Sequence, residues 1–228
     1  MTRSATSSRL LPLWPPIPPS QRTAERQAAL AALHAQVEAC RRCVTAGYLT
    51  EARPIGATRG RIGNALMLVG QAPGRLSMLH GRPFSGPGGK VLETWLARAG
   101  FAPGALRSEI YLSALTRCFP GPAAKGSGDR KPSAPELALC QPYLLHELEL
   151  VRPRGILVVG GMAISALLGP ARLEDVVGTV REREGVRLLA LPHPSGVSRW
   201  MNPPEHQALV SRALDHLAAW REEWERDS

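Results

Sequence analysis

Leu66-Met67-Leu68-Val69-Gly70-Gln71-Ala72-Pro73-Gly74 is a short apolar run that stops at a glycine- and proline-rich turn. Such a run is typical of a buried strand in a parallel sheet, and we expect the strand over Ala65–Val69. Apolar runs at Ile110–Leu115, Gly155–Val159 and Val186–Leu191 predict three more strands. Ligands of open parallel sheets bind beyond the carboxyl ends of the strands, so the loops after these runs are candidate binding loops.

Segments with helical character separate the predicted strands. Ser133 and Glu136 have the spacing of a capping box and predict the start of a long helix. The expected helices lie over Thr23–Cys43, Val91–Ala99, Ser133–Val151, Met162–Leu168 and Pro204–Trp220. Strands that alternate with helices predict an α/β fold, here a three-layer αβα sandwich with a central four-stranded parallel sheet. We expect one domain over residues 23–228, preceded by a flexible proline-rich arm over residues 1–22.

The chain is basic, with 28 lysines and arginines against 19 aspartates and glutamates and a formal charge of +9. This balance favours an acidic partner, with nucleic acid ahead of a membrane surface. A generally arginine-rich proteome is the alternative explanation. No apolar stretch approaches the roughly 20 residues that span a bilayer, and the first 20 residues make a poor signal peptide. We therefore expect a cytoplasmic protein, in which disulfides rarely persist.

Four cysteines lie in two distant parts of the chain. Cys40 and Cys43 form a CxxC pair, and Cys118 and Cys140 follow much later. Four thiolates suit a [4Fe–4S] cluster or a structural zinc ion, and the residues alone leave both open. The other interpretation is that they are small buried apolar residues, as free cysteines often are. Four of them in this arrangement favour the metal or cluster.

Several ordered motifs together resemble a known family. They are Gly70-Gln71-Ala72-Pro73-Gly74, Gly81-Arg82-Pro83-Phe84-Ser85-Gly86, the four cysteines and His193-Pro194-Ser195. In this order they resemble the iron–sulfur uracil-DNA glycosylases of family 4, over roughly Cys40 to Asn202. The segment from His193 to Arg199 is also similar to the last motif of the mismatch-specific uracil/thymine glycosylases. The resemblance implies a [4Fe–4S] cluster on Cys40, Cys43, Cys118 and Cys140, with zinc as the alternative.

The resemblance implies an enzyme of base excision repair that acts on DNA containing a deaminated base. Such an enzyme flips the damaged nucleotide out of the duplex and breaks its N-glycosidic bond. His193 matches the histidine that donates to uracil O2 as negative charge grows on the departing base. Backbone N–H groups near Gln71 and Ala72, after Gly70, would assist in the manner of an oxyanion hole. Phe84 matches the aromatic residue that stacks on the flipped ring.

The same resemblance assigns residues to DNA contact. The loop of Ser195, Gly196, Val197, Ser198 and Arg199 matches the loop that enters the minor groove. Val197 would be its apolar wedge, and Arg199 would contact phosphate. Ser85 and Gly86 lie where the backbone of the family approaches the DNA or the base closely.

Three positions depart from the family pattern. Ser77 stands at the catalytic position, in a stretch where family 4 has an acidic residue, and a hydroxyl can hold a water but supplies no negative charge. Ala114 replaces the asparagine that reads uracil, as in family 5. The loop asparagine of family 5 corresponds here to Asp129. We therefore expect a broadened or shifted base range, with hypoxanthine, xanthine or uracil opposite guanine as candidates.

The expected function is thus that of a DNA glycosylase, acting as a monomer and associated with the nucleoid. A lesion-binding protein that keeps the fold but has lost the chemistry is the alternative. An unrelated nucleotide- or cofactor-binding α/β enzyme is a third possibility, for which the ordered motifs leave little room.

Overall fold

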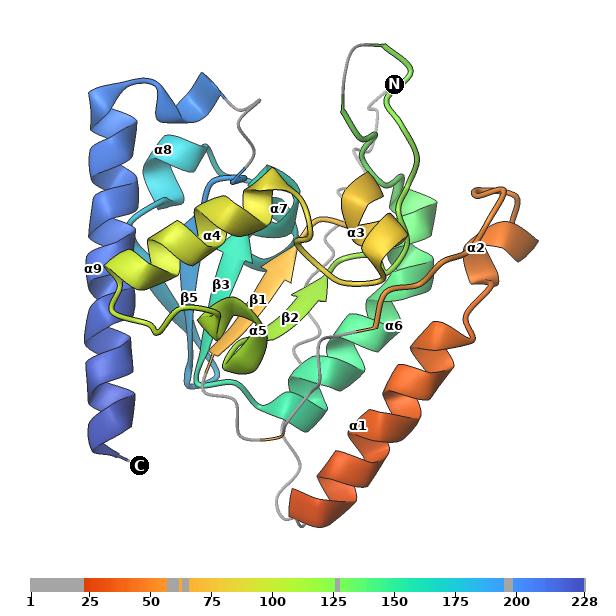
Figure 1. Cartoon of the computed structure of the whole chain (residues 1–228), viewed down its shortest axis with the longest axis horizontal. Coiled ribbons are helices and arrows are strands. Elements are labelled where there is room, and N and C mark those ends of the chain that lie inside the picture. The colour runs from red at the N-terminus through yellow and green to blue at the C-terminus, as the bar shows by residue number, and fades with distance from the viewer. Residues whose placement is uncertain (1–22, 57–61, 63–65, 126–127, 195–198, 228) are drawn as a thin grey trace, which may run out of the picture.

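A five-stranded sheet forms the centre of the computed structural model, which describes residues 23–56, 62, 66–125, 128–194 and 199–227. The strands lie in the order β2-β1-β3-β5-β4 (Figure 1). Four of them, which match the predicted runs, pair in parallel: β1 (Leu66–Gly70), β2 (Tyr111–Ala114), β3 (Gly155–Val159) and β5 (Val186–Leu191). The expected α/β architecture with a parallel core is therefore confirmed.

The fifth strand corrects the predicted strand count. β4 (Val180–Arg183) pairs antiparallel with β5 at the edge of the sheet. Its residues Val-Arg-Glu-Arg are mostly charged, so they lack the apolar run that marks the other strands. A two-residue turn connects the pair, with φ of 50° at Glu184 and 75° at Gly185. Two positive φ values in succession match the hairpin turns that follow the natural twist of paired strands.

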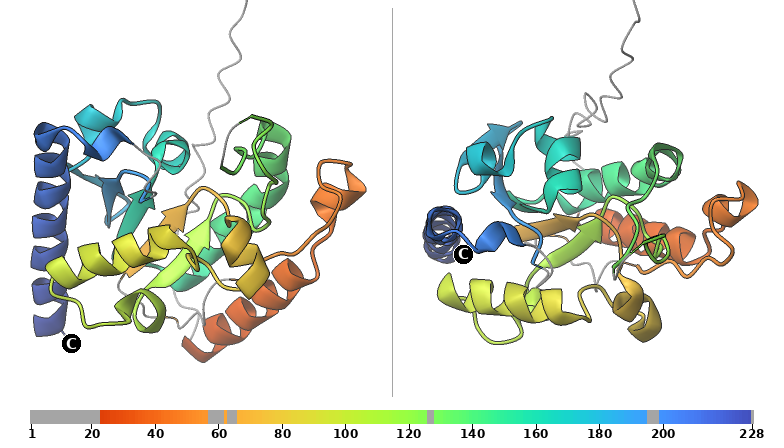
Figure 2. Two further views of the ribbon diagram at one scale, coloured as in Figure 1. Left: turned by 45° about the horizontal axis from the view of Figure 1, so that its top comes forward. Right: turned by 90° about the horizontal axis from the view of Figure 1, so that it is seen from above.

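Helices cover both faces of the sheet, as Figure 2 shows from above. On one face lie α6 (Ala134–Val151) and α7 (Gly161–Leu168), with α1 (Thr23–Glu38) packed against α6. On the other lie α4 (Pro87–Arg98), α5 (Ala105–Ser108) and α9 (Pro204–Arg226). The shorter helices are α2 (Arg42–Thr45), α3 (Arg75–His80), α8 (Leu173–Val176) and the 3₁₀ helix η1 (Arg199–Met201). The three-layer αβα arrangement follows.

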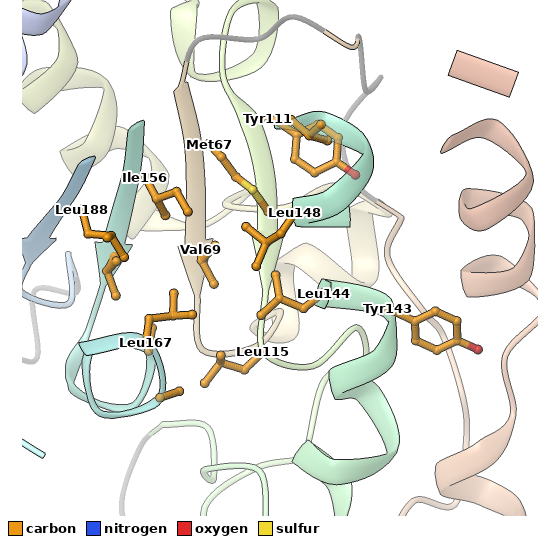
Figure 3. Close-up of a cluster of buried hydrophobic side chains, with 14 of the residues drawn as sticks. Met67, Val69, Tyr111, Leu115, Tyr143, Leu144, Leu148, Ile156, Leu167 and Leu188 are labelled. Atoms are coloured by element: carbon orange, nitrogen blue, oxygen red, sulfur yellow. The ribbon is translucent and has the colours of Figure 1, made fainter. Parts of the chain in front are cut away.

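Burial on both faces explains why the four parallel strands are mostly apolar. In β1, Met67 and Val69 belong to the core under α6 and α7, while Leu66 and Leu68 belong to the core under α4 and α9. Figure 3 shows the first of these cores, where Leu144 and Leu148 of α6 lie near Met67 and Val69. Each fully buried apolar side chain of this size contributes about 1.5–3 kcal/mol.

The helix expected over Thr23–Cys43 is shorter than predicted. α1 ends at Glu38, and a short α2 begins at Arg42, so Cys40 lies between two helices. Arg41 closes the end of α1, because its guanidinium donates to the carbonyl oxygens of Glu38 and Cys40 at 3.1 and 2.8 Å. A cation that binds the last carbonyls of a helix stabilises its end. The capping box predicted at Ser133 and Glu136 is present in full at the start of α6.

Candidate functional site

A pocket of about 490 Å³ opens beyond the carboxyl ends of β1 and β2. The parallel register pairs Gly70 with Ala114, so the two loops that follow these strands begin side by side. Residues from seven separate segments line the pocket. They include these predicted site residues: Gly70, Gln71, Ala72, Ser77, Phe84, Gly86, Ala114, Asp129 and His193. The structure therefore brings most of the expected site together.

Phe84 lies in the pocket wall on a strained backbone. Its φ of 51° is uncommon for an aromatic residue, and such strain persists only where the surroundings enforce it. A methyl group on Gly70 would lie 3.3 Å from Phe84 Cζ, so the ring lies over the end of β1. Arg107 of α5 donates to the carbonyl oxygens of Pro83 and Phe84 at 3.1 and 3.2 Å. This double contact holds the strained residue in place.

His193 follows β5 and reaches the pocket mouth, where its ring packs against Gly160 after β3. A methyl group on Gly160 would lie 3.3 Å from His193 Cδ2. The side chain is accessible to solvent, yet the protein atoms around the imidazole favour its neutral form and lower the pKa of His193. The Asp129 carboxylate opposes this shift of the pKa. A histidine that is neutral at neutral pH is a hydrogen-bond donor through one ring nitrogen.

Asp129 supplies a carboxylate to the pocket from the loop before α6. Its Oδ2 lies 2.9 Å from where a Cβ on Gly74 would be, so the carboxylate lies against the turn after β1. The next residue anchors this loop: the Arg130 guanidinium binds both Glu136 oxygens at 2.7 and 2.8 Å. That pairing, with further hydrogen bonds from Ser133, lowers the pKa of Glu136 to about 2. The position of Asp129 thus depends on the first turn of α6.

Ser77 is buried in α3 and lines the pocket at the position of the expected acid. Its hydroxyl accepts the Ser85 N–H at 3.4 Å, and the Ser85 hydroxyl donates to the Arg82 carbonyl oxygen at 2.8 Å. Of the described residues that line the pocket, only Asp129 carries a carboxylate. The described lining of the pocket therefore offers one carboxylate, which comes from the loop before α6 and not from the segment around Ser77.

The loop predicted to enter the minor groove is only partly described. Ser195, Gly196, Val197 and Ser198 lie outside the described residues, and Arg199 begins η1. Pro194, just before them, lines the pocket, and a methyl group on Gly88 would lie 3.4 Å from its Cγ. The loop thus leaves from the pocket mouth beside the start of α4.

Sequence reasoning missed a buried ion pair behind the pocket. Arg117 is 3% exposed and Glu147 of α6 is fully buried, and the guanidinium donates to Glu147 Oε2. The Ser113 hydroxyl donates to the same oxygen at 2.8 Å. Glu147 and the neighbouring His146 look like a solvated helix face in the sequence, so no pattern distinguishes the buried residue. Removing one partner of a buried pair typically costs about 3–5 kcal/mol.

The four cysteines line a second, small cavity. Cys40, Cys43, Cys118 and Cys140 are free thiols, and Arg117 separates their cavity from the larger pocket by lining both. Burial, followed by repulsion between thiolates, raises the pKa of Cys43 to about 11 and that of Cys118 to about 12. Among the described residues, no three histidine, cysteine, aspartate or glutamate side chains are arranged closely enough to bind a metal ion as they stand. The four cysteines nevertheless line the same small cavity, and four thiolates are a donor set that fits an iron–sulfur cluster or zinc.

Helices in the described part of the chain are all too short or too polar to cross a membrane.

The family model of the uracil DNA glycosylase superfamily matches residues 57–218. The chain is 31% identical to the type-4 uracil-DNA glycosylase of Archaeoglobus fulgidus over 172 residues, which cover 71% of this chain and 79% of the relative. It is 28% identical to the type-4 enzyme of Pyrobaculum aerophilum over 176 residues, or 73% and 83% of the two chains. A type-5 uracil-DNA glycosylase of the latter organism is 33% identical over 89 residues, or 38% and 36%.

Proposed function

Because the chain belongs to the uracil-DNA glycosylase superfamily, we propose that it removes uracil or a related deaminated base from DNA by breaking the N-glycosidic bond. The observation that carries this proposal is the meeting of His193 and Phe84 in one pocket with the turn after β1. The three features come from distant parts of the chain. Together they supply what the reaction needs: a donor for the leaving base, a surface for its ring and backbone for close approach.

The chemistry follows from these groups. The flipped base stacks on the Phe84 ring, which excludes water from one of its faces. As the glycosidic bond breaks, electrons pass to the base, and the neutral His193 ring donates a hydrogen bond to the oxygen that becomes negative. Gln71 and Ala72 line the same pocket, and their backbone N–H groups would assist. The Ser77 hydroxyl holds the water that completes the hydrolysis, without the charge that a carboxylate would provide.

The base range follows from Ala114 and Asp129. An asparagine at position 114 would pair with the base through both a donor and an acceptor, and such a pair contributes about 1–3 kcal/mol of discrimination. Alanine makes no such pair. The Asp129 carboxylate only accepts hydrogen bonds, so it suits a base that presents a ring N–H but does not read the adjacent carbonyl oxygen. Uracil, hypoxanthine and xanthine all present such an N–H, which supports a broad range of deaminated bases.

We further propose that Cys40, Cys43, Cys118 and Cys140 hold a [4Fe–4S] cluster, with zinc as the alternative. The support is that all four thiols line one cavity and that their crowding disfavours four uncompensated thiolates. Bound there, the group would supply a structural cross-link between the segment after α1 and α6 and would take no part in bond cleavage. We expect a monomer that works in the cytoplasm on nucleoid DNA.

Excision on a panel of duplexes tests the function. Duplexes with uracil, hypoxanthine or xanthine opposite guanine are incubated with protein and then treated with alkali. We expect strand scission on at least one of them, and a loss of about 100-fold or more in His193→Ala, the typical effect of removing one such donor. His146→Ala, which removes an exposed histidine of α6 outside the pocket, is the matched control.

A lesion-binding role is the second candidate, and the replacement of the expected acid by Ser77 favours it. In that case the protein binds the same duplexes tightly and leaves all of them uncut. Equal cutting by His193→Ala and wild type would instead keep the enzyme but remove His193 from its mechanism.

A further inference from the structure

Two exposed leucines stand at the mouth of the pocket. In the described part of the chain, three large apolar side chains are exposed: Tyr48 (42%), Leu76 (37%) and Leu79 (55%). Isolated apolar residues on a surface are ordinary, but Leu76 and Leu79 share the six-residue helix α3. They are three positions apart, which places them on the same side of a helix. The helix therefore presents an apolar ridge to solvent.

The ridge lies beside the pocket. Between the two leucines, Ser77 points the opposite way and lines the pocket. Leu76 Cδ1 is 3.3 Å from where a Cβ on Gly86 would be, so Leu76 covers the backbone at the start of α4. Figure 1 shows α3 beyond the carboxyl ends of β1 and β2, next to the loop that leads into α4. The helix therefore lies beside residues that line the pocket.

Positive charge surrounds the ridge. Arg75, His80, Arg82 and Lys90 are all exposed around the leucines. The sequence contains no aspartate or glutamate from Gly74 to Leu92. An apolar ridge with cations on its borders has the composition of side chains that enter a DNA groove, where cations contact phosphates and apolar groups separate stacked bases. Because the ridge lies beside the proposed base pocket, this composition fits DNA as the partner.

We propose that α3 is a second DNA-separating element, in which Leu76 and Leu79 press against the base pair beside the extruded nucleotide while Arg75 and Arg82 contact phosphates. This inference depends on the proposed function, since it places the substrate duplex at the pocket mouth. The ridge belongs to a different segment from the loop that follows Pro194.

The variant Leu76→Gln/Leu79→Gln tests the inference, with Tyr48→Gln as a matched control for loss of an exposed apolar side chain elsewhere. Excision is measured on three substrates with the same lesion: a duplex, a single strand, and a duplex with two mismatched base pairs beside the lesion. Separating stacked bases costs energy only in the intact duplex. We expect the ratio of duplex to single-strand excision to fall about tenfold or more in the double variant, to recover on the mismatched duplex, and to stay unchanged in Tyr48→Gln.

Other outcomes overturn the inference. An equal loss on all three substrates would mean that the leucines only shape the pocket. The ratio of duplex to single-strand excision could instead stay unchanged, while analytical ultracentrifugation shows a dimer for wild type and a monomer for the double variant. That outcome would mean that the ridge joins two copies of the chain. If the wild type cuts no substrate, the proposed function fails, and 2-aminopurine beside the lesion still tests the wedge. Its fluorescence should rise on binding of wild type and rise less with the double variant, and an equal rise would contradict the inference.

Discussion

Asp129 is a pocket residue that changes the pKa of His193. Its carboxylate raises the pKa of the histidine, while the surrounding protein lowers that pKa more strongly. The net result is a ring whose pKa lies below the ordinary value of 6.5, so it is mostly neutral at neutral pH. A neutral donor fits a leaving base that carries negative charge only transiently. Sequence reasoning selected both residues but had no means to find that they interact, because 64 positions separate them.

Removing this charge gives the first prediction. Asp129→Asn takes away the interaction that, among the described residues, raises the pKa of His193, so the pKa of the histidine should fall further. Following the imidazole protons by NMR from pH 8 to pH 4 measures the change directly. The same variant should move any histidine-dependent inflection of the rate to lower pH. A pKa that stays constant or rises would show that the two groups do not interact in solution.

Arg107 is a positioning residue that no sequence pattern indicates. It is a single exposed arginine on a four-residue helix, yet it donates to the carbonyl oxygens of both Pro83 and Phe84. The conformation that it holds, with φ of 51° at Phe84, costs about 1–3 kcal/mol without such support. Phe84 itself was identified from its motif. The positive φ of Phe84 could not be predicted from the sequence.

Arg107→Ala should therefore weaken excision without unfolding the protein. We expect kcat/KM to fall about tenfold, because one or two hydrogen bonds to strained backbone are worth about 1–2 kcal/mol. Arg107→Lys, which keeps the charge but loses the planar fork, should recover part of the loss. Thermal unfolding should change little, since the side chain is exposed. Arg181→Ala on β4 removes an equal charge from the surface outside the pocket and should leave the kinetics unchanged. A large drop in melting temperature for Arg107→Ala would indicate a merely structural role.

At the level of elements, the residues that cap the start of α6 also hold the loop that carries Asp129. Ser133 and Glu136 cap the helix, as predicted from their spacing, and the same Glu136 binds Arg130 next to Asp129. The capping box was visible because it is local in sequence. The ion pair between Glu136 and Arg130 could not be predicted, because it depends on how the loop before α6 folds back onto the helix.

Glu136→Gln should destabilise the protein in a pH-dependent way. The folded-state pKa of about 2 lies below the ordinary 4.5, so the carboxylate stabilises the fold fully above pH 4.5. That contribution disappears as the pH falls from 4.5 toward 2. We expect the free energy of unfolding at pH 7 to drop by about 1–3 kcal/mol in the variant, and the difference from wild type to shrink in acid. Urea unfolding at several pH values measures both. Glu222→Gln, an exposed position on α9, should show neither effect.

The strands show which elements periodicity reveals. Apolar runs identified β1, β2, β3 and β5, because burial on both faces favours mostly apolar residues. β4 escaped because an edge strand with one neighbour keeps charged side chains in water. The Glu184-Gly185 turn was its only local signal.

At the scale of the whole molecule, the cysteine cavity connects the N-terminal helices to the α/β body. The guanidinium of Arg42 in α2 donates to the Leu139 carbonyl oxygen at 3.3 Å and lies over the Tyr143 ring, so α2 already contacts α6 without a metal. A bound cluster would strengthen this connection. The number and arrangement of the cysteines predicted that they share one site, but not that Arg117 would lie between that site and the pocket.

Removal of the bound group gives the fourth prediction. The wild-type protein should be brown with broad visible absorbance, and Cys118→Ser or Cys140→Ser should lose the colour and melt several degrees lower, since binding to the folded state alone stabilises it. Metal analysis distinguishes iron from the zinc alternative, which would be colourless. If the serine variants match wild type in metal content and melting temperature, the cysteines are only small buried side chains.

The contact between Gly89 and Phe84 has a consequence for how this protein tolerates variation. A Cβ at Gly89 would stand 1.9 Å from the Phe84 carbonyl oxygen, a distance no real atom pair accepts. Gly81, by contrast, adopts φ of 62° in open space, where asparagine is tolerated. A complete substitution scan under selection for DNA repair should therefore accept Gly81→Asn and reject even Gly89→Ala. Single substitutions are therefore tolerated at Gly81, whereas at Gly89 any side chain would collide with the backbone of Phe84.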